Sequence, residues 1–161
     1  MTQVFLGLGS NLEREKNIRA GLHALTSIFG DLKLSQVYES ESVGFKGSHF
    51  YNLVVSLQTD LTIAELSETL KNIEDQNGRL RTGPKYSPRT LDIDILTYGG
   101  FVGVEAGVDL PRAEITENAF VLLPLAELAP HDLHPSLKKS YAELWASYDK
   151  NAQALWKIDL L

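Results

Sequence analysis

The pattern of apolar and polar residues divides the first two thirds of the chain into candidate strands and helices. Residues 4–9 form a short, almost wholly apolar run, and residues 50–61 are rich in aromatic and β-branched side chains, so both predict buried strands. Residues 32–38 alternate imperfectly between apolar and polar side chains, whereas residues 91–96 alternate strictly. A period of two predicts two further strands, each with one face in the core.

Two stretches between these strands carry apolar residues three and four positions apart, which is the spacing of an amphipathic helix. The first such stripe covers residues 18–29. The second follows Thr62 and Glu65, a hydroxyl and a carboxylate at capping-box spacing, and it stops at Asn77-Gly78. Both stretches are therefore predicted to be helices with one buried face.

The order of these elements predicts the fold class. Residues 39–48 and 99–107 are polar or glycine-bearing and predict loops, while residues 116–128 and 136–148 predict helix over part of their length. Strand, helix, strand, strand, helix, strand is the split βαβ order of ferredoxin-like proteins. We therefore expect an α+β protein whose residues 1–161 form a single domain, with one antiparallel sheet covered by helices.

Composition excludes several classes of site and partner. The 161 residues contain no cysteine, which excludes disulfides, thiolate metal sites, iron–sulfur clusters and cysteine nucleophiles. No apolar run approaches the roughly 20 residues that a membrane span needs, and no basic leader precedes the first apolar run. The net charge of −6 argues against a general nucleic-acid surface. We expect a cytoplasmic protein without a membrane or nucleic-acid partner.

One basic segment stands out in this acidic chain. Residues 79–89 contain four positive charges and no acidic residue, namely Arg79, Arg81, Lys85 and Arg89. A local cationic patch on an acidic protein suits a small anionic ligand better than a polyanion.

Asp92 and Asp94 lie two apart in the predicted strand 91–96, so their carboxylates should share one face of the sheet. Two neighbouring carboxylates are suitable ligands for Mg²⁺, although a solvated strand face with two surface aspartates would show the same spacing. The basic segment and Glu74 lie within twenty residues upstream. Cations that bind polyphosphate oxygens, beside acids that bind the bridging metal, indicate phosphoryl transfer.

Other motifs carry less information. The chain has no GxxxxGK[ST] motif, and Gly7-Leu8-Gly9 begins a dinucleotide fingerprint that fails at Leu12, so a tight turn is the simpler explanation of these glycines. The four histidines have no metal-ligand spacing and are predicted to be structural or on the surface. Phe50 and Asn52 should share a strand face, where a ring and an amide could bind a flat heteroaromatic, or simply be ordinary sheet residues.

Taken together, these motifs resemble the 6-hydroxymethyl-7,8-dihydropterin pyrophosphokinase family. The matching segments run in order and at similar spacing to about residue 130, and they are residues 7–12 (GLGSNL), 50–52 (FYN), 73–74 (IE), 78–81 (GRLR), 87–96 (SPRTLDIDIL), 120–122 (FVL) and 124–130 (PLAELAP). The resemblance implies a monomeric, ferredoxin-like enzyme that transfers the terminal pyrophosphate of ATP to the hydroxymethyl oxygen of a pterin and releases AMP.

The resemblance also implies a set of site residues. Asp92 and Asp94 would bind two Mg²⁺ ions, and with Arg79 and Arg89 they would form the catalytic group. The expected ATP-binding residues are Glu74, Arg81, Lys85, Tyr86, Ile95 and Arg112. The expected pterin-binding residues are Ser40, Val43, Phe50, Asn52 and Phe120.

Two positions and one segment depart from the family pattern. Arg112 replaces a histidine, Asn118 replaces an arginine, and residues 40–44 lack the prolines of the family's pterin loop. These changes leave a second hypothesis open, a paralogue with impaired transfer or a modified pterin substrate. A third, an RNA-recognition module of the same strand order, is disfavoured because the chain lacks an aromatic RNP-like strand and a basic sheet face.

Overall fold

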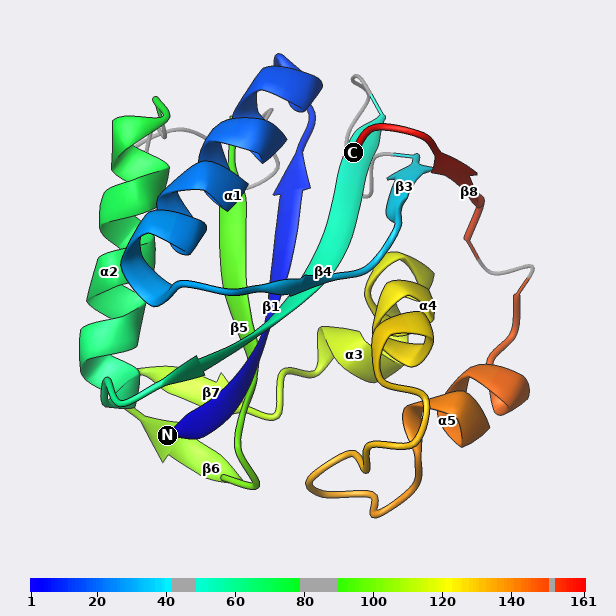
Figure 1. The fold of residues 1–161 in the computed structure, drawn as a ribbon. Coiled ribbons are helices and arrows are strands. Elements are labelled where there is room, and N and C mark those ends of the chain that lie inside the picture. The colour runs from blue at the N-terminus through cyan, green and yellow to red at the C-terminus, as the bar shows by residue number, and fades with distance from the viewer. Residues whose placement is uncertain (42–48, 79–89, 151–152) are drawn as a thin grey trace.

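The structure is a computed structural model, and it describes residues 1–41, 49–78, 90–150 and 153–161 (Figure 1). In chain order its elements are β1 (Thr2–Ser10), α1 (Arg14–Phe29), β2 (Lys33–Leu34), β3 (Val37–Ser40), β4 (Phe50–Thr59), α2 (Ile63–Gln76), β5 (Asp92–Tyr98), β6 (Gly103–Glu105), β7 (Val108–Leu110), α3 (Glu114–Glu117), α4 (Ala119–Leu128), α5 (Tyr141–Ser147) and β8 (Leu155–Ile158).

The main sheet has the strand order β5-β1-β4-β3-β8, and β2 pairs with β4 beside this path. All of its pairings are antiparallel, and β6 and β7 form a separate hairpin. Because β4 returns between β1 and β3, the first four strands of the order have the split βαβ arrangement. The predicted ferredoxin-like α+β fold is confirmed.

Two hydrophobic cores cover the two faces of this sheet. In β1, Leu6 and Leu8 point into the core beneath α1 and α2, whereas Phe5 points into a second core formed with α4 and α5. In β4, Val54 faces the same second core. Figure 1 shows α1 and α2 next to each other over one face, with α3, α4 and α5 gathered at the other. Alternate residues of the central strands thus contribute to the two cores, as strand alternation requires.

The sequence signals for α2 correspond to real contacts. The Thr62 hydroxyl accepts a hydrogen bond from the Glu65 backbone N–H at 3.1 Å, and the Glu65 carboxylate accepts one from the Thr62 N–H at 2.9 Å. This reciprocal pair satisfies two of the backbone donors that a helix start leaves open. The helix ends at Gln76, next to the predicted stop at Asn77-Gly78.

Two strand predictions need correction. The predicted strand 32–38 is interrupted, because the Ser35 hydroxyl accepts a hydrogen bond from the Val54 N–H at 2.9 Å and separates β2 from β3. β3 also continues to Ser40, so that Glu39 and Ser40 belong to the sheet and not to the predicted loop.

Gly7 and Gly9 do not form a turn. Both lie inside β1, and neither has a positive φ. The prediction of a tight turn at these glycines is therefore wrong. The reason for Gly9 is its close approach to Asn52, as described below.

The second half of the chain contains more strand than predicted, while the helix predicted over part of residues 116–128 and 136–148 is confirmed by α3, α4 and α5. The glycine-bearing stretch 99–107 contains β6 and the turn of its hairpin, and β8 was not predicted at all. Within residues 136–148 the helical part is α5, and before it the buried His134 Nδ1 accepts hydrogen bonds from the backbone N–H groups of Ser136 and Leu137, at 3.2 and 3.1 Å. His134 is thus structural, as predicted.

Within the described ranges, no helix combines the length and apolar character that crossing a bilayer would require.

Candidate active site

Asp92 and Asp94 share one face of β5. Their neighbours Ile93 and Ile95 are buried in the core beneath α1 and α2, so the two carboxylates point to the opposite side, as the spacing predicted. In the register of the sheet, Asp92 lies beside Gly9. The glycines of β1 put no side chain between the carboxylates and the rest of this face, and the Asp94 side chain is 46% exposed.

A β-bulge brings Arg112 to the carboxylate pair. Phe5 and Leu6 of β1 pair with Thr97 and Ile95 of β5, so Leu96 is an extra residue without a partner in β1. The Leu96 carbonyl oxygen instead accepts a hydrogen bond from the Arg112 backbone N–H at 2.9 Å. The chain after β7 is thereby attached to β5 next to the aspartates.

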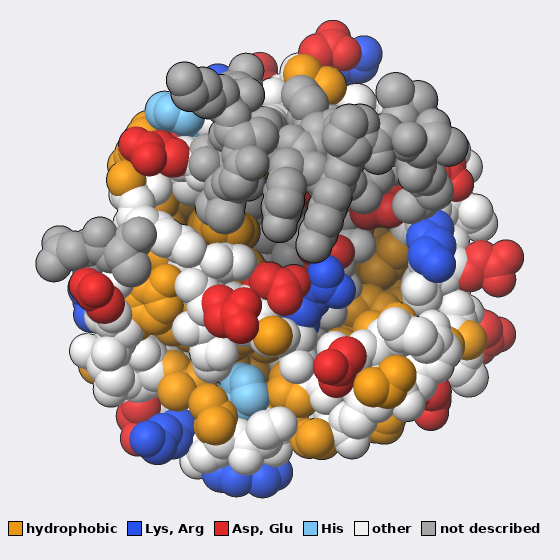
Figure 2. All heavy atoms as spheres, turned by 180° about the vertical axis from the view of Figure 1, so that it is seen from behind, with side chains coloured by type: hydrophobic (Ala, Val, Ile, Leu, Met, Phe, Trp, Pro, Cys, Tyr) orange, Lys and Arg blue, Asp and Glu red, His pale blue; other side chains and the backbone are white. Residues whose placement is uncertain are grey.

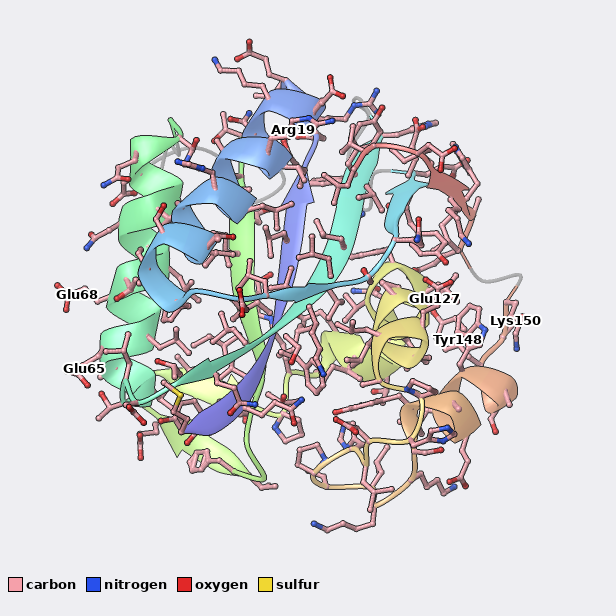
Figure 3. The ribbon with its side chains drawn as sticks, viewed as in Figure 1. Arg19, Glu65, Glu68, Glu127, Tyr148 and Lys150 are labelled. Carbon is pink, nitrogen blue, oxygen red and sulfur yellow. The ribbon has the colours of Figure 1, made fainter. Side chains whose placement is uncertain are left out.

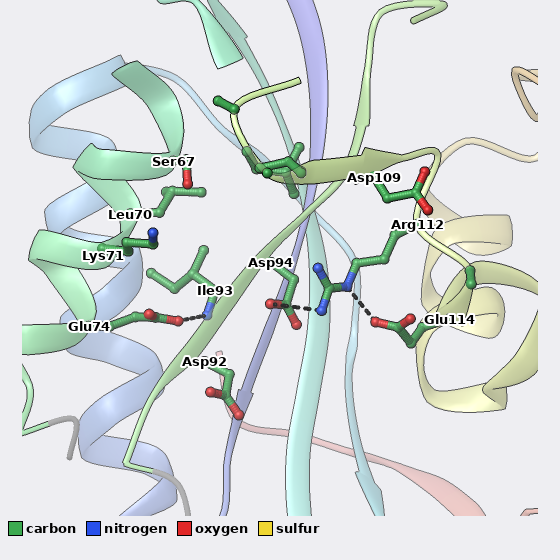
Figure 4. A pocket seen from close by; sticks show the side chains of 15 residues that line it. Ser67, Leu70, Lys71, Glu74, Asp92, Ile93, Asp94, Asp109, Arg112 and Glu114 are labelled. Carbon is green, nitrogen blue, oxygen red and sulfur yellow. Dashed lines mark hydrogen bonds and ion pairs between the residues drawn. The ribbon is translucent and has the colours of Figure 1, made fainter. Parts of the chain in front are cut away.

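The Arg112 side chain lies between two acidic groups. Its Nη2 is 3.6 Å from Asp94 Oδ1, and its Nε donates to the Glu114 carboxylate (Figure 4). Burial by itself would lower the pKa of the guanidinium, but the charges of Asp94, Glu114 and Glu74 outweigh it and raise the pKa above its ordinary value. Arg112 is therefore a permanent cation beside the carboxylate pair.

Glu74 of α2 supports the strand between the two aspartates. β5 is an edge of the sheet, and edge strands present backbone N–H groups that need a partner. The buried Glu74 carboxylate accepts the Ile93 N–H at 2.8 Å, as the dashed line in Figure 4 shows. This bond connects α2 to β5 and helps determine where Asp92 and Asp94 project.

A cavity of about 590 Å³ opens beside these groups. Its walls come from α2, from β5, from the β6–β7 hairpin and from the start of α3, and its lining residues are Ser67, Leu70, Lys71, Glu74, Asp92, Ile93, Asp94, Ile95, Ala106, Gly107, Val108, Asp109, Arg112, Ala113 and Glu114. On the face seen in Figure 2, acidic and basic side chains lie next to one another near the centre. The cavity is within the size range of small-molecule sites and could contain a nucleotide.

The donor set of this cavity suits Mg²⁺. Among the residues that the structure describes, no group of three or more histidine, aspartate or glutamate side chains is arranged to hold a metal. Magnesium in phosphoryl-transfer sites, however, is commonly bound by one or two carboxylates, with phosphate and water oxygens as the remaining ligands. Asp92 and Asp94 fit that requirement.

A second polar group lies on the same face, across the glycines. Asn52 of β4 is the register partner of Gly9, which is in turn the partner of Asp92, so the three residues form a row across the sheet. At the spacing of sheet strands this separates Asn52 from Asp92 by roughly 10 Å. The buried Asn52 amide donates through Nδ2 to the Ser40 hydroxyl at 3.0 Å.

The same row explains Gly9. A Cβ atom at this position would be 2.8 Å from Asn52 Oδ1 and 3.7 Å from the Phe50 ring. The first distance is shorter than real Cβ contacts, so any side chain here would displace the Asn52 amide. Gly9 therefore provides space for Asn52.

Of the remaining predicted residues, two are described by the structure and six are not; Asn118, which departs from the family pattern, was not itself a predicted ligand. Phe120 in α4 is partly buried against the second core, and Ile95 lines the cavity although it is only 5% exposed and packs in the first core. Asn118 is not among the described residues of the cavity lining, and its Oδ1 accepts a hydrogen bond from Gln153 Nε2 at 2.9 Å. Six predicted residues lie outside the described residues, namely Val43, Arg79, Arg81, Lys85, Tyr86 and Arg89.

Sequence reasoning missed three parts of the cavity. Glu114 belongs to no recognised motif, and the only sequence sign of its ion pair with Arg112 is that the two residues lie two positions apart. Lys71 lies on the same helix as Glu74, one turn earlier, so the helical period could have indicated it. Residues 106–109 of the β6–β7 hairpin overlap the glycine-bearing stretch 99–107, which the sequence predicted to be a loop.

Comparison with known proteins identifies a family that matches most of the chain. Residues 5–130 match the family model described as 7,8-dihydro-6-hydroxymethylpterin-pyrophosphokinase (HPPK). The 2-amino-4-hydroxy-6-hydroxymethyldihydropteridine pyrophosphokinase of Aquifex aeolicus is 34% identical over 145 residues, which cover 89% of this chain and 90% of the relative. The protein of the same name from Porphyromonas gingivalis is 37% identical over 141 residues, covering 84% and 95%.

A solved structure shows the same fold. The Plasmodium falciparum HPPK-DHPS protein superposes with a TM-score of 0.70 at 16% identity over 91% of this chain. The chain spans only 43% of the length of that protein. With a family model that matches most of its length and relatives more than 30% identical, the chain belongs to the 7,8-dihydro-6-hydroxymethylpterin-pyrophosphokinase family.

Proposed function

We propose that this protein transfers the pyrophosphoryl group of ATP to the hydroxymethyl oxygen of 6-hydroxymethyl-7,8-dihydropterin, releasing AMP, in folate biosynthesis. The observation that carries the proposal is the row Asp92–Gly9–Asn52, in which a carboxylate and an amide face the same side of the sheet about 10 Å apart, with no side chain between them. A polyphosphate beside the carboxylate would then end close to a heteroaromatic beside the amide.

The nucleotide would occupy the cavity between α2, β5 and the β6–β7 hairpin. Glu74 and Ile95 form part of its wall, and Arg112 provides a fixed cation at the end where Asp94 lies. Arg79, Arg81, Lys85, Tyr86 and Arg89 are proposed from the sequence pattern alone as further ligands of the triphosphate. Guanidinium groups suit this purpose because their donors match phosphate oxygens in pairs.

Asp92 and Asp94 would bind Mg²⁺, and we propose two ions. When bound there, Mg²⁺ would neutralise the negative charge of the polyphosphate, which otherwise repels the attacking hydroxymethyl oxygen. The two carboxylates determine where that charge is located, and the Glu74–Ile93 bond keeps both on one rigid strand.

The pterin would lie over β3 and β4. Asn52 presents an amide whose Nδ2 is already bonded to Ser40, so its orientation is set before any ligand arrives. Phe50 is on the same strand face, and Phe120 comes from α4, which packs on this side of the sheet. We propose that the two rings enclose the pterin and that Asn52, Ser40 and Val43 contact its polar edge.

The chemistry needs positioning more than covalent catalysis. Phosphoryl-type transfer proceeds in line and needs no covalent bond between the protein and the transferred group. Alignment of the two substrates and neutralisation of the phosphate charge therefore account for most of the rate. Arg79 and Arg89, with the two aspartates, are the residues we assign to this task. We propose that the protein acts as a cytoplasmic monomer, with ATP and the pterin as its ligands.

A second candidate is a paralogue that binds a pterin without efficient transfer. Two observations favour it: the Arg112 guanidinium is already held by Asp94 and Glu114, and Asn118 is bonded to Gln153 where the family has an arginine. By the family resemblance, the residues replaced at both positions help to hold the ATP phosphates and not the pterin.

Measurement of AMP release separates the two candidates. Purified protein is incubated with ATP, Mg²⁺ and 6-hydroxymethyl-7,8-dihydropterin, and AMP is quantified with and without the pterin. AMP that forms only with the pterin supports the pyrophosphokinase. Pterin binding by calorimetry with no AMP above background supports the paralogue and contradicts the proposed transfer.

A further inference from the structure

Glu39 lies next to Ser40 in β3 but faces the other side of the sheet. Its half-buried carboxylate accepts hydrogen bonds from three separate parts of the chain: Arg14 Nη1 at 3.2 Å, His49 Nδ1 at 3.1 Å and Trp156 Nε1 at 3.3 Å. Because an ionised carboxylate only accepts, the His49 Nδ1 must carry the proton. Helix α1, the residue before β4, and β8 thus converge on one acidic group.

Further contacts join the donors to one another. Arg14 Nη1 also donates to the His49 carbonyl oxygen at 3.1 Å, and its guanidinium lies 4.0 Å from the centre of the Tyr51 ring. The rings of His49 and Trp156 meet edge to face at 5.4 Å. We call Arg14, Glu39, His49, Tyr51 and Trp156 the Glu39 cluster.

The Glu39 cluster determines how the end of β3 lies against the start of β4. In the sheet register, Glu39 pairs with Tyr51, while the next pair is Ser40 with Phe50. These pairs alternate between the two faces, so a shift that breaks the cluster on one face would also move Ser40 away from Asn52 on the other. The bond between them is 3.0 Å long and buried, and it has little tolerance for such a shift.

The C-terminal strand takes part in this arrangement. Trp156 is the register partner of Glu39 in the β3–β8 pair, yet β8 lies beyond residues 5–130, where the family model matches. The electrostatics are consistent with an ionised Glu39: burial would raise the pKa of its carboxyl, but hydrogen bonds from Arg14 and His49 and the charge of Arg14 lower it below its ordinary value.

We infer that Glu39 is a positioning residue for pterin binding, and that β8 supports the pterin side of the site through Trp156. The inference rests on the proposed function, because it takes Ser40, Phe50 and Asn52 as pterin-binding residues. Glu39 itself faces the opposite side of the sheet from Ser40 and Asn52, so we expect it to touch neither substrate.

The test is Glu39→Gln, which keeps the side-chain shape but removes the charge to which three donors point. We expect the KM for the pterin and its dissociation constant by pterin fluorescence to rise about tenfold, which is about 1.4 kcal/mol, while kcat and the KM for ATP change less than about twofold. A general loss of structure would instead change all of these constants together.

Arg19→Ala is the matched control. Arg19 also connects α1 to the C-terminal segment, through the Leu160 carbonyl oxygen, but it is exposed on α1 (Figure 3), and its other side-chain partner in the described structure is Glu15 and not the Glu39 cluster. All kinetic constants of this variant should equal those of the unmodified protein. A pterin KM that rises equally in both variants would overturn the inference.

Trp156→Phe covers the case in which Glu39→Gln does not fold. It removes only the Nε1 donor of a side chain that is 42% exposed, so folding should be retained, and the pterin KM should rise about threefold. An unchanged pterin KM in this variant overturns the inference. If the unmodified protein neither binds the pterin nor releases AMP, the proposed function itself fails; if it does both and the variants match Arg19→Ala, only the role of Glu39 fails.

Discussion

Replacement of Glu74 by alanine should destabilise the fold and weaken the metal–nucleotide site together. Glu74 is 7% exposed, and its carboxylate accepts the edge N–H of Ile93 at 2.8 Å. Alanine leaves that N–H without its partner and empties the space of the side chain. Because Ile93 separates Asp92 from Asp94, the loosened strand end is the one that carries both carboxylates.

The magnitude follows from the parts that are lost. A hydrogen bond to a charged group contributes about 1.5–3 kcal/mol, and the buried methylene that is removed contributes about 0.8 kcal/mol. Removal of one negative charge near Asp92 and Asp94 relieves some repulsion and offsets part of this sum. We expect a net loss of about 2–3 kcal/mol, which lowers the Tm by roughly 5–10 °C.

The assay is urea unfolding followed by tryptophan fluorescence, combined with calorimetric binding of a non-hydrolysable ATP analogue in Mg²⁺. Glu74→Gln keeps a neutral acceptor and should lose only about 1 kcal/mol, since bonds to charged acceptors are roughly twice as strong as neutral ones. Glu68→Ala is the control, because Glu68 is exposed on the same helix and points away from the protein in Figure 3. A Glu74→Ala variant within about 0.5 kcal/mol of the unmodified protein would refute the reasoning.

Three further predictions concern other parts of the structure. Asp94→Asn should lower AMP release at least about a thousandfold. It should change the free energy of unfolding by less than about 1 kcal/mol, because the ion pair of Asp94 with Arg112 is partly exposed. Substantial residual AMP release would contradict the proposed magnesium site. Gly9→Ala should displace Asn52 and abolish pterin binding while nucleotide binding persists, which calorimetry with each ligand measures separately. Burial lowers the pKa of His134, so the folded state resists its protonation more than the unfolded state does. The contribution of neutral His134 to the free energy of unfolding is complete above the ordinary pKa of about 6.5 and is lost as the pH falls below it. The Tm should therefore fall between pH 7.5 and pH 5.5, and less steeply in His134→Asn, whose amide oxygen can still accept; equal slopes in both proteins would exclude His134 as the cause.

Local pattern was sufficient for the elements and for the carboxylate pair. The period of two in residues 91–96 places Asp92 and Asp94 on one face whatever else the chain does, and the capping box at Thr62 starts α2 without help from distant residues. The order of strands and helices then leaves few topologies, and the ferredoxin-like sheet is one of them. These features depend on residues close together in the chain.

Contacts between distant segments were beyond that pattern. The bulge at Leu96 brings Arg112 to Asp94, and nothing within either segment announces it. Glu74 was predicted as a nucleotide ligand, which stays a prediction. The sequence did not show that its carboxylate also accepts the edge N–H of β5, because this partner is recognised only once β5 is known to be the edge.

The glycines of β1 and the end of the chain show the same division. Gly9 was interpreted as part of a turn because the sequence cannot show that the Asn52 side chain packs directly against it. Strand β8 was missed because its four residues do not alternate strictly, and they form a strand only because β3 offers an unpaired edge. The alternation of side chains is a property of a few consecutive residues, so it can be predicted from the chain alone. Register, edges and close approaches arise only when strands far apart in the chain pair, so they required the tertiary structure.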